Sequence, residues 1–327
     1  MTDATFADTT PAPRLSLGER WYIDKRLKGL TRFALAITVL NILGHLFLGF
    51  EQSWMTPFVA LAAAYGTEFL AETVQARVDG RAPKYKGTPG TVIAFFLSAH
   101  ISALAVGMLL FANEQIWVVA FAASLAVASK WIVRVPVRMG AKTVQRHVLN
   151  PSNFGITATL LLFPSVGIAP PYMFAENVSG IFDFLLPLVV IGTGSLLNTK
   201  LTGRMTLIFA WLGCFALQAL IRSTINGTPL GASLMPMSGF AFILFTFYMV
   251  TDPATTPGKP RNQVLFAAAV AGFYALFMQL HIVFGLFYAL TLVTALRGAW
   301  LAVQAIVPAS DPARAEADLA VLRTPGE

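Results

Sequence analysis

The stretch "LTRFALAITVLNILGHLFLGF", residues 30–50, contains one charged side chain, Arg32, and is otherwise almost entirely apolar. A helix needs roughly 20 such residues to cross the hydrocarbon core of a bilayer. The stretch therefore predicts a membrane-spanning helix. It decides the fold class because similar runs recur along the whole chain.

Composition supports the same interpretation. Of the 327 residues, 56% are hydrophobic and only 12% are charged, which is more apolar than a soluble globular domain. We predict an all-α integral membrane protein with ten transmembrane helices. The predicted spans are 30–50, 54–74, 90–110, 116–133, 153–168, 181–196, 205–221, 237–250, 264–278 and 282–306.

The positive charges predict the orientation of these spans. Cytoplasmic loops are enriched in Lys and Arg, and of the 23 Lys and Arg residues only Arg222 falls where ten spans predict the outer face. Both termini are therefore expected in the cytoplasm, and the net charge of +7 reflects topology rather than a nucleic-acid partner. The N-terminus lacks the short apolar core of a cleavable signal. We expect a multi-pass protein of the bacterial cytoplasmic (inner) membrane, surrounded by lipid.

Five spans per half predict two halves of opposite orientation, as in inverted repeats. The halves would be residues 30–168 and 169–306, between a cytoplasmic tail at 1–29 and another at 307–327. "GTPGTVIAFFLS" (87–98) opens the third span, and "GTPLGASLMPMSGFAFILF" (227–245) leads into the eighth. If the match reflects a repeat, Gly and Pro interrupt the helix at both places and line an internal site.

One candidate site lies in "RHVLNPSNFGI", residues 146–156, where a basic loop enters the fifth span. Asn150 or Ser152 can cap the helix, and Pro151 suits its first turn. With Asn153, the same side chains also place amide and hydroxyl groups beside free helix N–H donors, which suits an anion or the polar edge of a ring. The residues favour the two interpretations equally.

A second candidate is "FYMVTDPATTPGKPRN", residues 247–262, which follows an aromatic run. Asp252 and Pro253 fit the first two positions of a type I turn. Such a turn does not by itself require Thr255 and Thr256. The Thr-rich middle of this loop is therefore the part that indicates a function.

Two further candidates lie inside predicted spans. Glu68 and Glu72 are one turn apart on the second span, and an intramembrane carboxylate is by default functional or paired. An ion pair with Arg77 or another base near the cytoplasm is one alternative, and ion passage is the other. His100 lies near mid-span, and with His45 it could hold a haem, but interhelical hydrogen bonding is favoured.

Other chemistry has no motif in this sequence. No nucleophile arrangement, metal-ligand spacing or phosphate-binding loop is present, so no catalytic residue and no metal site are predicted. The one cysteine, Cys214, excludes an internal disulfide and a cluster held by cysteines of this chain. An aromatic run is expected in the core or facing lipid, where one or two rings could stack on a planar cofactor: Phe240, Phe242, Phe245, Phe247 and Tyr248.

Three stretches together resemble a known family. "EFLAETVQARVDGRAPKYKGTPGTVIAFFLS" (68–98), "NPSNFGITATLLLFPS" (150–165) and "SGFAFILFTFYMVTDPATTPGKPRNQVLFAAAVAGFYALF" (238–277) are similar, in order and spacing, to one family of membrane proteins. This is the RnfD/NqrB family, whose members are membrane components of the Rnf electron-transport complex and of the sodium-pumping NADH:quinone oxidoreductase. The resemblance covers roughly residues 30–306.

The resemblance implies ten helices in two inverted halves and an intramembrane flavin that transfers electrons coupled to ion movement. The family's hallmark is a Thr in an outer loop that binds FMN through a phosphoester. In the matching "FAENVSGIFDF" (174–184), Phe182 stands where that Thr is expected. Covalent flavin attachment is therefore not expected. The chain most resembles the divergent branch found in some bacterial enediyne biosynthesis clusters.

We therefore expect an electron-transfer protein that binds a flavin, FMN or riboflavin, without a covalent bond and works with redox partner proteins. The resemblance implies a site made of Asn150, Ser152, Asn153, Thr251, Asp252, Thr255 and Thr256. The alternative is a cofactor-free transporter, or a membrane protein of a biosynthetic cluster, that retains the fold. Glu68 and His100 are then the transport candidates.

Overall fold

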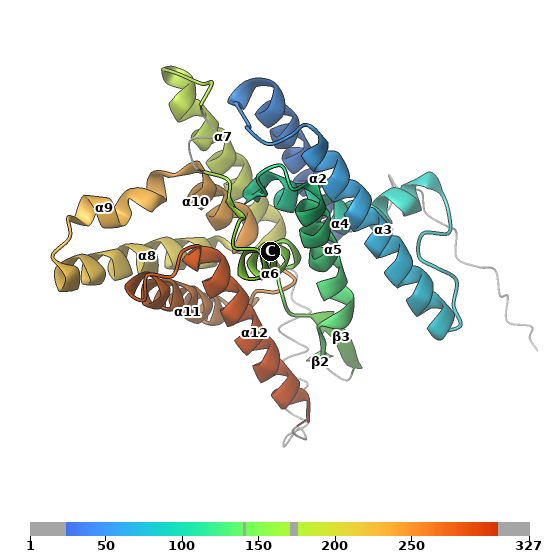
Figure 1. Ribbon diagram of the computed structural model, residues 1–327. Coiled ribbons are helices and arrows are strands. Elements are labelled where there is room, and N and C mark those ends of the chain that lie inside the picture. Colours follow the sequence, from blue (N-terminus) through green and yellow to red (C-terminus); the bar gives the residue numbers. More distant parts are fainter. Residues whose placement is uncertain (1–23, 140–141, 171–175, 307–327) are drawn as a thin grey trace, which may run out of the picture.

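The computed structural model describes residues 24–139, 142–170 and 176–306. Most of both expected tails, at 1–23 and 307–327, therefore lies outside the described residues. The described chain is mainly helical, and each of the ten predicted spans contains a helix (Figure 1).

The helices of residues 24–170 follow one another with few interruptions. They are α2 (Lys25–Leu43), continued by a π-helical turn (Gly44–Leu48), then α3 (Met55–Val78), α4 (Pro89–Leu109), α5 (Ile116–Ile132) and α6 (Pro151–Leu162).

The helices of residues 176–306 are more broken. They are α7 (Ile181–Leu197) with a π-helical turn (Asn198–Thr202), α8 (Met205–Asn226), α9 (Leu230–Leu234) with a 3₁₀ turn (Met235–Ser238), α10 (Phe240–Leu244) with a π-helical turn (Phe245–Met249), α11 (Pro260–Gln279) and α12 (Gly285–Ile306).

Six of these helical segments are long and apolar enough to cross a membrane, by length and composition. A seventh crossing is counted if Leu230–Ser238 and Phe240–Met249, which meet at 64°, form one broken span. The chain thus has the helices of a multi-pass membrane protein. The six segments are Arg26–Leu48, Pro89–Leu109, Ile181–Thr202, Met205–Asn226, Pro260–Gln279 and Gly285–Ala305.

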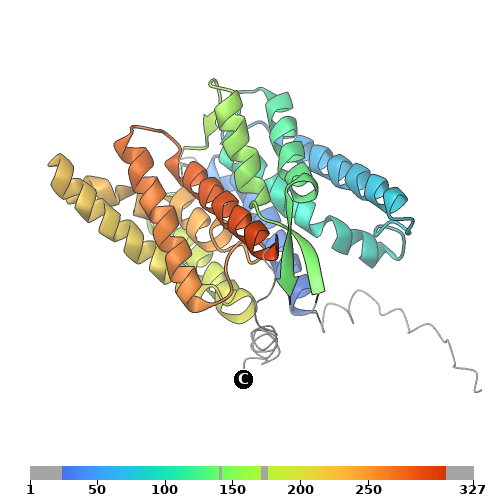
Figure 2. The same ribbon diagram turned by 90° about the horizontal axis from the view of Figure 1, so that it is seen from below.

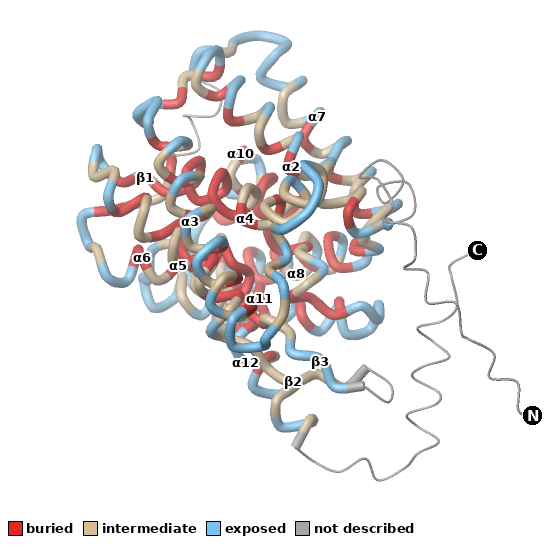
Figure 3. Tube along the Cα trace, turned by 90° about the vertical axis from the view of Figure 1, so that its right-hand side faces the viewer, coloured by how far each residue is buried: buried red, intermediate tan, exposed pale blue. Residues whose placement is uncertain are grey.

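The distribution of exposed side chains agrees with a lipid environment. Leu35 and Phe184 are 64% and 75% exposed, and many other large apolar side chains also point outward. Figure 3 shows buried segments inside and exposed segments around them. In water such a surface would favour aggregation, whereas lipid covers it at no cost.

Small residues bring the helices of the interior close together. A Cβ atom added at Gly155 of α6 would lie 2.5 Å from the carbonyl oxygen of Ala122 on α5 and 2.8 Å from the Cβ of Ala126. Both alanines are fully buried. Close approach at small residues is the usual packing of helices in membranes.

Helix α6 is shorter than the predicted fifth span at 153–168. It has 12 residues and ends at Leu162, so its length is about 18 Å, well below the roughly 30 Å of a hydrocarbon core. Pro164 follows two residues later, and the residue before a proline disfavours helical geometry. Gly167–Ile168 (β4) instead pairs antiparallel with Leu110–Phe111 (β1).

A β-hairpin is the second departure from the all-α prediction. Arg134–Met139 (β2) pairs antiparallel with Lys142–His147 (β3), in the segment that we expected to be a basic loop. Val135 and Val137 are two residues apart and are flanked by Arg134 and Arg138, which is the period of a strand. The prediction of helices alone is therefore wrong for these two small sheets.

The third and eighth predicted spans differ in kind. A repeat of the two matching stretches would interrupt both, but α4 is one continuous helix of 21 residues, with Pro89 in its first turn. Proline suits that position because the first N–H groups of a helix have no partner within it. The eighth segment is broken, as expected, and it bends before Phe240.

The helices pack in two groups. α3 packs against α4 and α5, whereas α11 packs against α8 and α12. Figure 1 shows α2–α5 on one side, α8, α9 and α11 on the other, and α6 between them. α12 packs against both α6 and β2, and Figure 2 shows the hairpin beside this helix.

Candidate functional site

The two sequence motifs implied by the resemblance meet in space. Asn150 caps α6: its Oδ1 accepts from the backbone N–H of Asn153 (3.1 Å) and from the hydroxyl of Ser152 (3.2 Å). Its Nδ2 donates to the carbonyl oxygen of Met249 (3.0 Å), 99 residues further along the chain. The predicted cap is confirmed, and the same side chain also holds the start of the Thr-rich loop.

Asn153 is fully buried and binds α12. Its Nδ2 donates to the carbonyl oxygen of Phe287 (2.9 Å) and to the hydroxyl of Thr291 (2.7 Å). Thr157, one turn on, donates to the same Phe287 carbonyl (3.1 Å) and lies 2.9 Å from the Thr291 hydroxyl. The buried Oδ1 of Asn153 has no hydrogen-bond partner among the described residues.

The loop after the eighth segment folds around Asp252. Oδ1 of Asp252 accepts from the backbone N–H of Ala254 (3.0 Å), and Oδ2 accepts from the Thr255 hydroxyl (2.9 Å). The Asp252 carbonyl accepts from the backbone N–H of Thr255 (3.3 Å) and of Thr256 (3.1 Å). The predicted turn is therefore present.

The threonines take part in this turn, contrary to our expectation that the turn leaves them unexplained. The Thr256 hydroxyl donates to the Asp252 carbonyl (2.6 Å), as Thr255 does to the carboxylate. Thr251 donates to the carbonyl oxygen of Phe247 (2.8 Å). All three threonines are buried, and an isolated buried hydroxyl would be costly.

Two arginines from other parts of the chain donate hydrogen bonds to this loop. Arg204 donates through Nε to the Thr256 hydroxyl (2.9 Å) and through Nη2 to the carbonyl oxygens of Pro253 and Thr256 (both 3.4 Å). Arg297 of α12 donates to the Thr255 carbonyl (3.0 Å). Neither arginine has a carboxylate ion-pair partner in the described part of the chain. Sequence reasoning assigned both only to topology.

Burial shifts the protonation of groups around this loop. It lowers the pKa of Arg204, and the negative charge of Asp252 offsets part of that shift. Burial also lowers the pKa of His147, at the end of the hairpin, again partly offset by Asp252. Asp252 is thus the acidic group that faces this set of cations.

A cavity lies beside Tyr248, the residue that precedes Met249. Its volume is about 260 Å³, and it lies between α2 and α7. Tyr248 and Phe33 stack in its wall with ring centroids 5.2 Å apart, and the Tyr248 hydroxyl is 2.8 Å from that of Thr193. The lining residues are Arg32, Phe33, Ala36, Thr193, Leu196, Leu197, Lys200 and Tyr248.

Sequence reasoning found Tyr248 as one of several rings but missed its neighbours. Arg32 and Lys200 come from different parts of the chain, and the structure brings them to one cavity. Neither forms an ion pair among the described residues. Each is a single charged residue near one end of an apolar run, and we interpreted both only as markers of membrane topology. Phe182 lies apart from this cavity, exposed in the first turn of α7.

Both carboxylates of the second predicted span are paired. Glu68 Oε2 lies 2.8 Å from Lys130 Nζ on α5, and both side chains are less than a tenth exposed. Trp131 Nε1 also donates to Glu68 (3.3 Å). The predicted ion pair of Glu68 with a basic residue is confirmed, and this residue is Lys130 rather than Arg77.

Glu72 has different partners at the end of α3. It accepts from Arg81 at two oxygens, one at 3.2 Å, and from the backbone N–H of Lys84 (2.7 Å). The hydrogen bond with Glu72 raises the pKa of Arg81. This carboxylate therefore fastens the loop between α3 and α4.

His100 joins three helices by hydrogen bonds. Its Nε2 lies 2.7 Å from the hydroxyl of Thr38 on α2, and its Nδ1 lies 2.7 Å from the hydroxyl of Tyr65 on α3. His45 instead contacts the carbonyl oxygen of Asn41 (2.9 Å) in its own helix. Interhelical bonding by His100, the favoured interpretation, is confirmed.

Comparison with protein-family models gives no match, and comparison with curated proteins also gives none. The family resemblance therefore remains a prediction from the quoted motifs.

Proposed function

We propose that the chain is a ten-span protein of a bacterial cytoplasmic membrane that binds a flavin without a covalent bond and relays electrons between partner proteins. The observation that carries this proposal is the cavity at Tyr248. It combines an aromatic wall with two cations that have no carboxylate partner in the described part of the chain. Both termini would lie in the cytoplasm, and the two inverted halves would meet at this cavity.

The residues of the cavity fit part of a flavin. The volume of about 260 Å³ is just below the roughly 300–1,000 Å³ of small-molecule sites, which suits a ring system rather than a whole nucleotide. Tyr248 can stack on the ring, and Arg32 and Lys200 can pair with a phosphate or with a reduced, anionic ring. When bound, the flavin would supply one- and two-electron redox chemistry.

The motif residues would act mainly by positioning. Asn150 holds the Met249 carbonyl beside Tyr248, and Asp252, Thr255 and Thr256 close the loop that follows. Asn153 is not among the residues that line the cavity and would act only by joining α6 to α12 at Phe287 and Thr291. We place the proposed site at the Tyr248 cavity, between α2 and α7.

The test of flavin binding is direct. The protein purified in a neutral, mild detergent should show the visible absorption of oxidised flavin, and acid should release all of it. Replacing both Arg32 and Lys200 by Gln should weaken FMN binding roughly 10-fold or more, the effect of one or two charge-assisted hydrogen bonds. Arg77→Gln, which changes an exposed arginine on α3, is the matched control. A colourless preparation that also fails to take up added FMN would refute the proposal.

The ten-span topology has its own test. Cys214 is the one cysteine, so Cys214→Ser gives a background without thiols. Single cysteines at Glu114 and at Gly258 should then react with a membrane-impermeant maleimide from opposite sides of sealed cells or vesicles. Reaction of both from the same side would contradict the proposed topology.

Transport is the second candidate, favoured by the 64° break in the eighth segment and by the buried Glu68–Lys130 pair. Broken helices and intramembrane charges are typical of substrate pathways in transporters. Proton or sodium flux into vesicles should then be lost when Glu68 and Lys130 are both replaced by Gln, which removes the pair without leaving an unpaired charge. Asp252→Asn should retain the flux. Unchanged flux in the double variant would exclude this role for the pair.

A further inference from the structure

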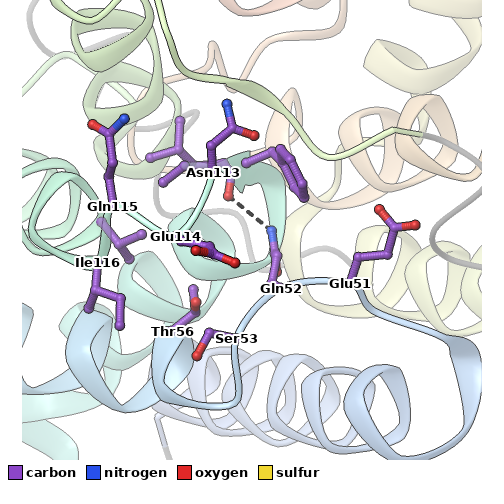
Figure 4. A pocket seen from close by; sticks show the side chains of 12 residues that line it. Glu51, Gln52, Ser53, Thr56, Asn113, Glu114, Gln115 and Ile116 are labelled. Carbon is purple, nitrogen blue, oxygen red and sulfur yellow. Dashed lines mark hydrogen bonds between the residues drawn. The ribbon is translucent and has the colours of Figure 1, made fainter.

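The two ends of α5 differ in charge. A cavity of about 310 Å³ beside its first turn is lined by Glu51 and Glu114 but by no lysine or arginine (Figure 4). Beyond its last turn the β-hairpin begins, and there Arg146 of β3 lies near Arg204 and Arg297. The predicted topology places this second end in the cytoplasm.

Two of the three arginines meet at the Thr-rich loop. Arg204, just before α8, donates to the hydroxyl and to the carbonyl oxygen of Thr256 (2.9 and 3.4 Å). Arg297 of α12 donates to the carbonyl oxygen of Thr255 (3.0 Å). Because Thr255 and Thr256 are consecutive, the two guanidinium groups lie close to each other.

Arg146 approaches the same place from the hairpin. Val148, two residues further on, lies so close to α12 that a Cβ added at Gly298 would be 2.6 Å from its Cγ2, and Gly298 directly follows Arg297. Burial lowers the pKa of Arg204, and the positive charge of Arg146 lowers it further, against the opposing effect of the loop's carboxylate. The charge of Arg146 also acts on Arg297. The three arginines therefore form one cluster.

The chain does not neutralise this cluster. Within residues 24–139, 142–170 and 176–306, none of the three arginines forms an ion pair with a carboxylate. Asp252 is the acidic group nearby, but its carboxylate accepts from the backbone N–H of Ala254 and from the hydroxyl of Thr255. Three arginines thus face one carboxylate, and their mutual repulsion favours the binding of an anion.

The free donors of the cluster can be reached by a ligand. Among the described residues, Arg297 donates only through Nη1, and the Arg146 side chain donates to none. Both side chains are half-buried, and none of their nitrogens is both buried and unpartnered. Arg204, in contrast, is 8% exposed and donates to the loop. Arg146 and Arg297 would therefore contact a ligand, and Arg204 would add charge from behind.

The arrangement suits a phosphate group. A guanidinium group binds phosphate through two parallel hydrogen bonds. A phosphate monoester carries up to two negative charges on three free oxygens, so it can serve guanidinium groups that come from different elements. A carboxylate has one charge and two oxygens in one plane.

The surface beside Arg297 is apolar. Leu296 and Trp300, in the same stretch of α12, are 51% and 62% exposed. Tryptophan is frequent where a helix leaves the hydrocarbon core of a membrane. An acyl chain attached to the phosphate could lie along these side chains, so we expect a lipid phosphate to bind more tightly than the same phosphate without acyl chains.

We propose that Arg146, Arg204 and Arg297 form a binding site for a phosphate monoester, carried by a lipid headgroup or by a soluble molecule. The site is separate from the Tyr248 cavity, whose cations are Arg32 and Lys200. It does not depend on a flavin.

The test uses the full chain in a neutral detergent and isothermal titration. Dihexanoylphosphatidic acid should bind saturably with a Kd below about 1 mM. Glycerol 3-phosphate, which has the same phosphate without acyl chains, should bind roughly 10-fold more weakly. Equal affinity of the two would assign the site to a soluble phosphate ester. Dihexanoylphosphatidylcholine, in which choline blocks the phosphate, should bind roughly 10-fold more weakly than the phosphatidic acid.

The variants separate the cluster from the overall charge. Arg146→Gln and Arg297→Gln should each weaken binding of the phosphatidic acid roughly 10-fold, the effect of one charge-assisted hydrogen bond. Arg297→Lys should lose less, because it keeps the charge and loses only the fork. Arg77→Gln, which removes an exposed arginine of α3, is the matched control and should have no effect.

Three results would overturn the proposal. Equal binding of the phosphatidylcholine would show that acyl contact alone is sufficient. Equal weakening by Arg77→Gln would show that any positive charge is sufficient. Absence of saturable binding by both phosphate monoesters would exclude the site. Flavin absorption should be the same in every variant, so each outcome is independent of the flavin test.

Discussion

The ion pair between α3 and α5 allows the sharpest quantitative prediction. Glu68 and Lys130 are 9% and 7% exposed, and their charged atoms are 2.8 Å apart. Coulomb's law gives about 6 kcal/mol for this separation at an effective dielectric constant of about 20. Desolvation opposes most of this attraction while both charges are present. Removing one partner leaves the other charge buried and unpaired, which typically costs about 3–5 kcal/mol.

Glu68→Gln should therefore lower the free energy of unfolding by about 3–5 kcal/mol, and Lys130→Gln should have a similar effect. The double variant should be more stable than either single one, because no unpaired charge remains. The measurement is SDS-titrated unfolding in mixed micelles, followed by tryptophan fluorescence. Trp131, which bonds Glu68 and stacks under Arg134, reports on the same contact.

The double-mutant cycle separates a direct pair from unrelated effects. Arg77→Gln, on the exposed side of the same helix, should change stability by no more than about 0.5 kcal/mol. A coupling energy below about 0.5 kcal/mol between Glu68 and Lys130 would refute the argument. So would a stability that falls strongly with added salt, because a buried pair is screened little.

Three further predictions concern packing, the cation set and pH. Gly155→Ala should cost about 1–3 kcal/mol, since the new Cβ would meet the Ala122 backbone at 2.5 Å, whereas Gly213→Ala, with open space around it, should be neutral in the same unfolding assay. Arg204→Lys should cost about 2 kcal/mol, because an ammonium group cannot reproduce the fork that binds Thr256 and Pro253; unchanged thermal stability would contradict this. Burial lowers the pKa of His147, so the folded state binds its proton less readily than the unfolded state. Its contribution to stability is therefore complete above about pH 6.5 and lost as the pH falls below that value, and His147→Asn should reduce the fall of the melting temperature below about pH 6.5.

The helices could be predicted from sequence because their signal is local. Each of the ten apolar runs contains a helix, and residue type alone limited the cap of α6 to Asn150 or Ser152, of which the structure shows Asn150. The end of α6 was missed because the apolar run continues past Leu162. Pro164 was the signal for that end, and hydropathy does not record it.

Partners across the chain could not be predicted in the same way. The position of Glu68 predicted an ion pair with a basic residue. The sequence alone could not show whether that residue is Arg77 or Lys130, because this depends on which helices are in contact. The hairpin was missed for a related reason: its strands are short and basic, and a count of charges per loop does not register alternation. The cavity at Tyr248 combines residues from distant segments, so no local pattern could reveal it.

The bonds from α6 have a consequence for how the molecule can move. Asn150, Asn153 and Thr157 make five hydrogen bonds to Met249, Phe287 and Thr291. At roughly 0.6 kcal/mol each inside a membrane, separating the two groups of helices here would cost about 3 kcal/mol before any change in packing. Alternating access by rocking of one half against the other would have to break these five hydrogen bonds in every cycle. Electron relay requires no such movement, and a scaffold held stiff at its centre would keep donor and acceptor distances constant.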